Sequence, residues 1–256
     1  MGEEWFYLVL PFIFWCLSRE LGLCIGVVLI FNDYTNGLLK GLFHSPRPWD
    51  PRIAILQHET SWGFPSGHSQ NAVALWGYAA LWLRSPAAWL LAVALPLFIG
   101  FSRVYLGVHF PHDVVGGWLA GIVVLVLFQA GVKLSRRLRL VPFVVLLIAL
   151  SVPLALLVPA LNESGTRDMG LLMGVGVGAV LERQFVRYRT QGSPVQQAGR
   201  LALGLAVLVV LWLGLRVLLP PSPWFRFLRY AVVALWITLG GPWLFVRLGL
   251  ARREAG

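Results

Sequence analysis

The chain is a succession of long apolar runs separated by short breaks that are charged or rich in proline and glycine. Apolar positions within each run are continuous rather than alternating, which predicts membrane-spanning helices and argues against a β-barrel. Several runs approach the ~20 residues that a helix needs to cross the hydrocarbon layer, and the shorter ones predict tilted or partly interfacial helices. We expect about nine spans, over residues 5–17, 20–42, 67–83, 86–102, 112–132, 138–160, 168–182, 200–219 and 225–247.

The composition also indicates an integral membrane protein. Charged side chains make up only 12% of the 256 residues, and apolar side chains make up 58%. A soluble globule could not bury so much apolar surface, and a disordered, collagen-like or disulfide-framework protein would have a different composition. Cys16 and Cys24 lie in apolar runs without metal-ligand spacing, and we interpret them as small core residues. No cleavable signal peptide is expected, because the first run follows Glu3 and Glu4 without a basic leader.

Basic residues are unevenly distributed between the two sides that alternating spans would create. By the positive-inside rule, the cytoplasmic side is the one that carries Arg19, Arg84, Lys133, Arg136, Arg137, Arg139, Arg183, Arg187, Arg189, Arg200, Arg247, Arg252 and Arg253. The outward side carries most of the acidic residues together with Lys40, Arg47, Arg52, Arg103, Arg167, Arg226 and Arg229. The net charge of +10 is therefore mostly a topology signal, with anionic membrane lipids as expected neighbours. Nucleic acid is not an expected partner, because the basic residues are dispersed over loop ends.

Polar residues of the outward side gather in three clusters, each where a span meets that face. The clusters comprise Lys40, Arg47 and Pro48 at the end of the second run, Pro65, Ser66, Gly67 and His68 at the start of the third, and Ser102, Arg103, His109 and Asp113 between the fourth and fifth.

Residues of all three clusters together have the chemistry of an anion site. Lys40, Arg47 and Arg103 place three cations on a face that is otherwise poor in positive charge, which indicates an anionic ligand. Arginine adds bidentate hydrogen bonds that lysine cannot make. Ser66 is a favourable helix cap and Gly67 permits close approach of the backbone, so the N–H groups at this helix start suit a phosphate.

The histidines indicate group transfer. His109 and Asp113 are four residues apart, and hence on one face if the fifth helix begins near Pro111. Asp113 could bind one ring nitrogen of His109 and leave the other as an oriented nucleophile or base. His68 would supply acid assistance to the leaving group from a different helix. This arrangement predicts phosphoryl transfer without a required metal, because the cations and helix-end donors would stabilise the charge.

Each cluster also has a structural interpretation. Lys40 and Arg47 could be an interfacial pair that reaches lipid headgroups, and His109 with Asp113 could be a structural hydrogen-bonded pair. The Pro-Ser-Gly-His segment alone is an ordinary helix start. A metal site matches no recognised ligand motif, although candidate ligands lie nearby: His44, His58, Glu59 and His112. The conjunction of three clusters on one side favours the phosphate interpretation.

In order and spacing, the clusters resemble the three-part signature of the type 2 phosphatidic acid phosphatase (PAP2) superfamily, which also includes vanadium haloperoxidases and glucose-6-phosphatase. The matching residues are Lys40-x6-Arg47-Pro48, Pro65-Ser66-Gly67-His68 and Ser102-Arg103-x5-His109-x3-Asp113, and the resemblance covers residues from about 20 to 130. It implies a helical-bundle core and, as in membrane members of the family, dephosphorylation of lipid phosphates and diphosphates without a metal or other cofactor.

The resemblance also implies a role for each motif residue. His109 would become phosphorylated, Asp113 would orient it, and His68 would protonate the departing oxygen and later activate water. The phosphate-binding positions would be Lys40, Arg47, Ser66, Gly67, Ser102 and Arg103.

We expect an all-α, polytopic transmembrane helical bundle, with a six-helix PAP2-like catalytic core at residues 1–160 and an extension of about three spans at residues 161–256. The outer loop between the first two clusters is short and contains Trp49, Trp62 and Phe64, so lipid tails are expected to enter sideways from the membrane. Small residues in the extension suit close packing or a homodimer, with a second substrate passage as the alternative: Gly170, Gly174, Gly176 and Gly178. Four polar residues of the extension either line the entrance to the active site or are solvated residues at a loop end: Glu163, Ser164, Arg167 and Asp168.

The expected function is that of a metal-independent lipid phosphatase in the plasma (inner) membrane, with its site on the extracytoplasmic side. By family analogy the preferred substrate is a polyprenyl diphosphate such as undecaprenyl diphosphate, because an external site suits recycling of carrier lipids. Phosphatidylglycerol phosphate, phosphatidic acid and sphingoid phosphates are alternatives. A vanadate-dependent peroxidase is disfavoured, because such relatives are generally soluble. A lipid-phosphate transporter or binding protein without turnover is the non-enzymatic alternative.

Overall fold

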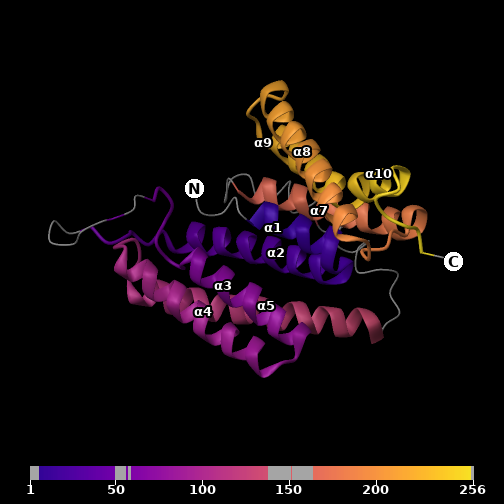
Figure 1. Cartoon of the computed structure of the whole chain (residues 1–256). Coiled ribbons are helices and arrows are strands. Elements are labelled where there is room, and N and C mark those ends of the chain that lie inside the picture. Colours follow the sequence, from indigo (N-terminus) through magenta and orange to yellow (C-terminus); the bar gives the residue numbers. More distant parts are fainter. Residues whose placement is uncertain (1–5, 50–55, 57–58, 138–150, 152–163, 255–256) are drawn as a thin grey trace. The chain divides into compact units, whose positions relative to one another are not determined.

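The computed structural model describes residues 6–49, 56, 59–137, 151 and 164–254 (Figure 1). Within these ranges the regular structure is helical, with one isolated antiparallel bridge between Tyr188 and Arg253, so the all-α prediction is confirmed. The helices are α1 (Phe6–Phe12) with η1 (Ile13–Leu17), α2 (Arg19–Phe43), α3 (Gly67–Leu83), α4 (Pro86–Tyr105), α5 (Pro111–Arg137), α7 (Gly165–Leu181) with η2 (Glu182–Val186), α8 (Pro194–Leu218), and α9 (Pro223–Leu235) with η3 (Trp236–Gly240) and α10 (Gly241–Arg247).

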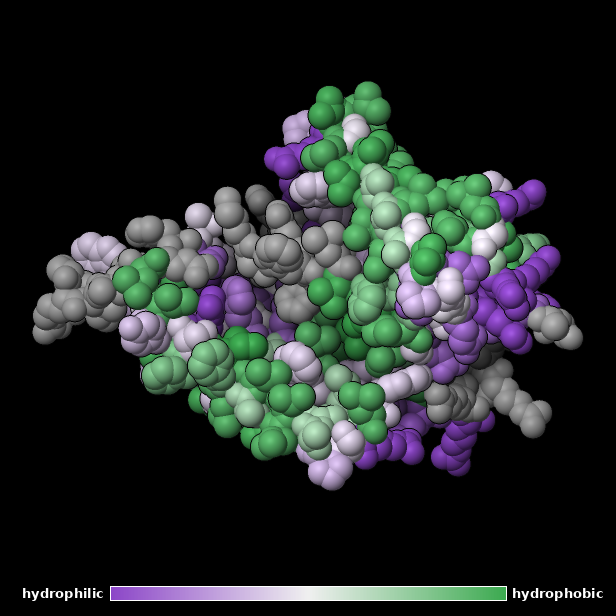
Figure 2. Space-filling model, in the orientation of Figure 1, coloured by the Kyte–Doolittle hydropathy of each residue, from purple (hydrophilic) through white to green (hydrophobic). Residues whose placement is uncertain are grey.

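Eight of the nine expected spans coincide with these helices. The remaining one, at residues 138–160, lies almost entirely outside the described residues. Six described helices are long and apolar enough to cross a membrane: Arg19–Phe43, Pro86–Tyr105, Pro111–Leu134, Gly165–Val186, Pro194–Leu218 and Pro223–Arg247. Large apolar side chains on these helices are exposed, for example Leu90, Phe98 and Val210. Figure 2 shows such hydrophobic residues over much of the visible surface. The chain is an integral membrane protein.

The chain forms two compact units. Residues 28–138 make up the core unit, and residues 1–27 together with 139–256 make up the terminal unit. The N-terminal segment therefore belongs to the same compact unit as the C-terminal part of the chain. The order of the apolar runs along the sequence does not reveal this grouping. The division into a catalytic core at 1–160 and an extension at 161–256 stays a prediction.

In the core unit, α3 packs against both α4 and α5 (Figure 1). Glycines on α5 permit the close approach, because a Cβ at Gly117 would lie 2.5 Å from the carbonyl oxygen of Ser66 and one at Gly121 would lie 2.7 Å from that of Gln70. The indole of Trp118 donates to the carbonyl oxygen of Pro96 at 3.2 Å and ties α5 to α4. The start of α3 is therefore held tightly against the first turns of α5.

In the terminal unit, α7 packs along α9. Gly170 lies against the backbone of Phe227, and Gly174 lies against the backbone of Ala231, at positions where a Cβ would collide. The close packing expected from the small residues is therefore observed, and its partner is a helix of the same chain. A homodimer stays a prediction.

A buried arginine joins separate segments of the terminal unit. The guanidinium of Arg200 donates to four carbonyl oxygens, at distances of 2.5–3.1 Å; they belong to Trp15, Thr190, Gln191 and Leu250. Because these bonds satisfy its donors, Arg200 can be completely buried. This explains how a cation from the expected cytoplasmic set can have a structural function.

Candidate active site

Arg47 links the first and third motif clusters. Its Nη1 lies 2.8 Å from the carbonyl oxygen of Val108 and 3.1 Å from Nε2 of His109. Its Nε and Nη2 donate to the carbonyl oxygen and hydroxyl of Ser61, at 2.6 and 3.0 Å. The extended segment after α2 is thereby fixed beside the turn between α4 and α5, which brings a guanidinium to the ring of the histidine.

His109 lies between Arg47 and Asp113. Its Nδ1 is 3.4 Å from Oδ2 of Asp113, and the two side chains are almost completely buried. The same Oδ2 accepts the backbone N–H of Phe110 at 2.9 Å, which fixes the carboxylate at the first turn of α5. With Nδ1 protonated toward Asp113, the lone pair of Nε2 faces Arg47. The predicted i, i+4 pairing of His109 and Asp113 is therefore present, and it leaves Nε2 as the ring nitrogen that faces Arg47.

The environment of His109 favours its neutral form. Burial lowers the pKa of His109 below the ordinary value of 6.5; the hydrogen bond to Asp113 opposes this effect, and the charges of Arg47 and Lys40 reinforce it. A neutral imidazole has the free lone pair that a nucleophile requires.

Lys40 occupies the last turn of α2 and points to the same loop as Arg47. Its Nζ donates to the carbonyl oxygen of Trp62 and lies 3.3 Å from the hydroxyl of Ser61. Ser61 thus contacts both cations, a function that the sequence motifs did not suggest. The expected convergence of Lys40 and Arg47 from two different elements is observed.

The second cluster forms the start of α3. The hydroxyl of Ser66 caps the helix by accepting hydrogen bonds from Ser69. The backbone N–H of Ser66 donates to the carbonyl oxygen of Asp113 at 2.9 Å. A Cβ on Gly67 would lie 3.2 Å from Oδ1 of Asn36, so α2 explains the small residue at this position. Both groups of Ser66 are thus engaged within the protein. Phosphate binding by Ser66 and Gly67 stays a prediction.

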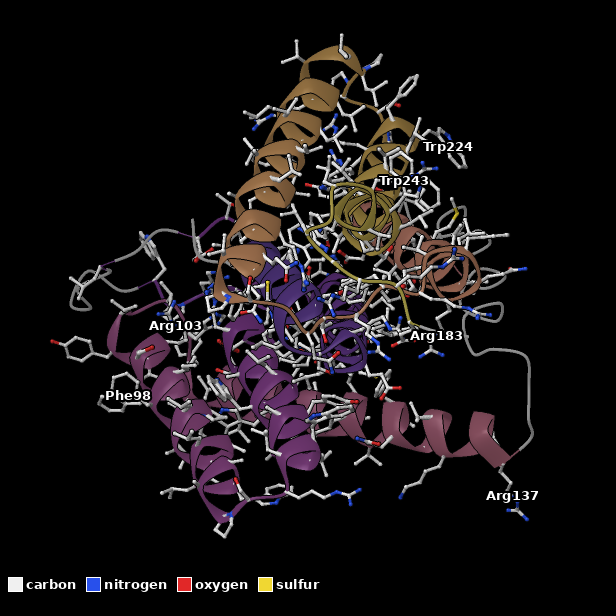
Figure 3. All side chains as sticks on the ribbon, turned by 45° about the vertical axis from the view of Figure 1, so that its right-hand side comes forward. Phe98, Arg103, Arg137, Arg183, Trp224 and Trp243 are labelled. Carbon is white, nitrogen blue, oxygen red and sulfur yellow. The ribbon has the colours of Figure 1, made fainter. Side chains whose placement is uncertain are left out.

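The remaining motif residues lie close enough to interact electrostatically. His68 interacts with Arg103, His109 and Arg47. Arg103 lies in the last turn of α4, where its Nε is 3.3 Å from the hydroxyl of Ser102 (Figure 3). Ser102 itself donates to the carbonyl oxygen of Ile99 at 2.7 Å. Residues from three clusters that are distant in the sequence therefore surround one region.

Glu59 is a member of this region that the motif did not identify. Its carboxylate interacts electrostatically with Arg47, His68 and Arg103. The sequence signal for Glu59 is its position in the loop just before the second cluster, although a glutamate there is equally a candidate metal ligand. A carboxylate among the cations limits the repulsion between them.

A buried amide network supports the start of α3, and the sequence analysis did not anticipate it. Gln70 donates to the side-chain and backbone oxygens of Asn32 at 3.0 Å and accepts from Asn36 at 2.8 Å. Asn36 also donates to the carbonyl oxygen of Pro65 at 3.2 Å, and Asn32 donates to Asn71 at 2.6 Å. The signal was four amide side chains within two apolar runs, since such groups need polar partners in a membrane.

Metal ligation was a conceivable use of the neighbouring histidines. In the described ranges, no group of three or more His, Cys, Asp or Glu side chains is arranged to hold a metal ion. His44 instead packs edge-on against Trp62, and His112 stacks on Phe110. His58 lies outside the described residues.

Comparisons with known proteins match two family models. Residues 21–137 match the PAP2 superfamily, and residues 166–253 match the PAP2 superfamily phosphatase transmembrane extension. The core match contains every residue of the three clusters, and the two matches together cover most of the chain.

Relatives of the core region include bacterial enzymes. Phosphatidylglycerophosphatase B of Bacillus subtilis (strain 168) is 33% identical over 127 residues, which cover 46% of this chain and 61% of that protein. Undecaprenyl-diphosphatase BcrC of the same organism is 32% identical over 133 residues, which cover 51% of this chain and 65% of that protein. The chain thus spans less than two thirds of the length of either curated relative.

A crystal structure of a transmembrane PAP2 type phosphatidylglycerolphosphate phosphatase from Bacillus subtilis is 29% identical, with a TM-score of 0.42, over 50% of this chain and 67% of that chain. The matched range of the PAP2 superfamily model, residues 21–137, contains the three clusters and the buried His109–Asp113 pair. On these grounds the chain belongs to the PAP2 superfamily.

Proposed function

We propose that the chain is a lipid phosphatase that transfers the phosphoryl group of its substrate to His109. The observation that carries this proposal is the row formed by Asp113, His109 and Arg47, in which a carboxylate holds Nδ1 and a guanidinium lies 3.1 Å from Nε2. A guanidinium beside the nucleophilic nitrogen is in position to bind the oxygens of the phosphorus atom that the nitrogen attacks.

In the first step, Nε2 of His109 forms a bond to the terminal phosphorus as the bond from that phosphorus to the leaving oxygen breaks. The leaving oxygen is the bridging oxygen of a diphosphate, so that the lipid monophosphate departs, or the ester oxygen of a monophosphate. In the free site, burial and the charges of Arg103, His109 and Arg47 lower the pKa of His68 to about 4. The negative charge of a bound phosphate opposes this effect, so that His68 can carry the proton that it gives to the departing oxygen. Asp113 stabilises the positive charge that develops on the ring of His109. Lys40, Arg47 and Arg103 neutralise the phosphoryl oxygens, which is the function that a metal ion has in other phosphoryl-transfer enzymes.

In the second step, water attacks the phosphorus of the phosphohistidine. His68 accepts the proton of that water, the bond between nitrogen and phosphorus breaks, and phosphate leaves with His109 neutral again. The same residue thus acts first as acid and then as base, as microscopic reversibility requires.

The substrate we propose is a polyprenyl diphosphate, cleaved at the extracytoplasmic side of the plasma (inner) membrane. The excess of basic residues on the opposite loops supports this side. One relative is named for undecaprenyl diphosphate and another for phosphatidylglycerophosphate, so both classes belong in the assay.

The lipid tail is proposed to enter from the membrane along α4. Phe98, Phe101 and Tyr105 are each about 70% exposed on this helix, and Phe101 stacks on Tyr105. Figure 3 shows Phe98 pointing away from α4, near the helix end that carries Arg103. Apolar side chains near the cations would let a tail remain in lipid while its headgroup binds.

The test is phosphate release by the purified full-length protein in detergent, from a panel of undecaprenyl diphosphate, phosphatidylglycerol phosphate, phosphatidic acid and sphingosine phosphate. We expect release from at least one lipid in the presence of EDTA, and loss of release in His109→Ala. The matched control is His44→Asn, because His44 has φ 45° and asparagine tolerates this conformation. Tight lipid binding without release from any substrate would instead indicate a binding protein or transporter.

A further inference from the structure

The turn between α8 and α9 borders an open cavity that the PAP2 motif does not include. α8 ends at Leu218, where Pro220 and Pro221 prevent its continuation, and Ser222 caps α9 by accepting from the N–H of Phe225. The cavity has a volume of about 600 Å³ and is lined by this turn and by Arg216, Arg226 and Arg229. The local fold thus assembles three guanidinium groups around one space.

These arginines come from two helices. Arg216 lies in the last turn of α8, whereas Arg226 and Arg229 are three residues apart on one face of α9. The described residues that line the cavity include no acidic side chain. Nε of Arg229 is buried and has no hydrogen-bond partner in the part of the chain that the structure describes. A ligand with several acceptor oxygens would satisfy this donor and reduce the repulsion between the cations.

The surroundings of the cavity are apolar. Val217 and Leu218 in its lining are 85% and 77% exposed, and Trp224 beside it is 58% exposed (Figure 3). In Figure 2 the α8–α9 hairpin is mostly hydrophobic on its visible surface, with hydrophilic residues beside its tip. Tryptophan and arginine together are typical of the headgroup level of a membrane. The cavity therefore combines anion-binding groups with a rim that suits acyl chains.

The positive-inside rule does not account for these cations. Alternation of the spans assigns Arg226 and Arg229 to the outward side, where the rule disfavours basic residues. Three arginines that converge on one cavity at that side need another explanation, and ligand binding provides one.

We propose that this cavity binds the phosphate group of an anionic lipid. Each guanidinium presents parallel N–H donors that match phosphoryl oxygens, and the apolar rim contacts the lipid tails. Inorganic phosphate has the same oxygens but no tail. The site is separate from the residues proposed for catalysis, so it does not depend on turnover at His109.

The test uses the full-length protein in nanodiscs of phosphatidylcholine with and without phosphatidylglycerol, and counts bound phosphatidylglycerol by native mass spectrometry. The variant is Arg216→Gln/Arg226→Gln/Arg229→Gln. The matched control removes three exposed arginines elsewhere, Arg137→Gln/Arg189→Gln/Arg252→Gln. The three site arginines contact one phosphate, and each arginine near a membrane surface contributes about 1 kcal/mol, so we expect the site variant to weaken phosphatidylglycerol binding about a hundredfold. The control removes arginines that do not share one pocket, so its binding should weaken by less than about tenfold.

A competition arm with inorganic phosphate distinguishes the two sources of the anion. Phosphatidylglycerol binding that depends on the three arginines and resists inorganic phosphate assigns the site to a lipid, whereas displacement by inorganic phosphate assigns it to the phosphate group alone. Equal binding by the site variant and the control overturns the proposal. If the triple variant does not fold, Arg216→Gln/Arg226→Gln leaves the partly buried Arg229 in place and should still weaken binding by about thirtyfold.

Discussion

The most informative single substitution is Asp113→Asn, because the structure predicts which of its interactions survive. Oδ2 of Asp113 accepts the backbone N–H of Phe110 at 2.9 Å and lies 3.4 Å from Nδ1 of His109. An asparagine would place its single oxygen there, since the opposite orientation would direct an NH2 group at the N–H of Phe110. Its NH2 would then replace Oδ1, which lies 3.2 Å from Nε2 of His112. The tautomer of His109 and the local fold should therefore persist.

What the variant loses is the negative charge beside His109, whose ring would become positive in the proposed phosphoryl transfer. Across 3.4 Å, two unit charges interact by about 5 kcal/mol at an effective dielectric constant of about 20, and by about 1 kcal/mol in water. The pair is almost fully buried, so the effect should lie toward the first value. Because each 1.36 kcal/mol is about a factor of ten in rate, kcat should fall by between about tenfold and a few thousandfold.

The assay measures kcat for phosphate release from the best lipid of the panel, and circular dichroism follows the thermal transition. Asp33→Asn, which changes an aspartate on α2 outside the row, is the matched control. An Asp113→Asn protein with an unchanged melting temperature and a kcat within about twofold of wild type would refute the charge-stabilised nucleophile. A lowered melting temperature with normal kcat would indicate that Asp113 acts only in the fold.

Three further predictions follow from the same region. Arg47→Lys should lower kcat/KM by at least about a hundredfold, because an ammonium group cannot reproduce the fork that contacts Ser61 and His109; equal kcat/KM in steady-state assays would contradict this. Burial lowers the pKa of His109 below 6.5, so its neutral form, which the proposed mechanism requires, persists at pH values where an ordinary histidine is protonated. The fall of kcat/KM toward acid pH, corrected for substrate ionisation measured by 31P NMR, should therefore have its midpoint below pH 6.5. A midpoint above pH 6.5 would contradict the assignment. Gln70→Leu removes three hydrogen bonds between helices, each worth about 0.6 kcal/mol in a membrane, and should lower the unfolding free energy by about 2 kcal/mol, whereas Gln129→Leu on α5 should not.

The helices were largely predictable from the sequence because hydropathy and helix-ending residues act locally. Apolar runs and Pro, Ser and Gly at their ends correctly placed α3 at residues 67–83 and the start of α4 at Pro86. The grouping of residues 1–27 with the C-terminal part was not predictable, because it depends on contacts such as the hydrogen bond from Trp15 to the carbonyl oxygen of Ile237. Contacts between residues so distant in the chain leave no periodic pattern.

Of the titratable residues near the proposed site, the sequence motifs include His68, His109 and Asp113 but not Glu59 or the supporting groups. The i, i+4 spacing of His109 and Asp113 directly encodes their pairing on the first turn of α5 and the turn before it. The contact from Arg47 to the carbonyl oxygen of Val108 could not be inferred, because any residue offers a carbonyl oxygen. Ser61 was missed for a related reason, since a serine in a loop has no distinguishing pattern until its cationic partners are located.

Under the proposed mechanism, the contact between Arg47 and His109 would give the nucleophilic nitrogen two states. Without substrate, Nη1 of Arg47 lies 3.1 Å from Nε2 and can donate to the lone pair that would attack phosphorus. A phosphate competes for the same guanidinium with two or three charged oxygens, which are stronger acceptors than a neutral imidazole. Substrate binding would therefore release the lone pair as it occupies the cation. Removing the guanidinium should then leave His109 free but its target unbound, so Arg47→Ala should reduce catalysis even though it exposes the nucleophile.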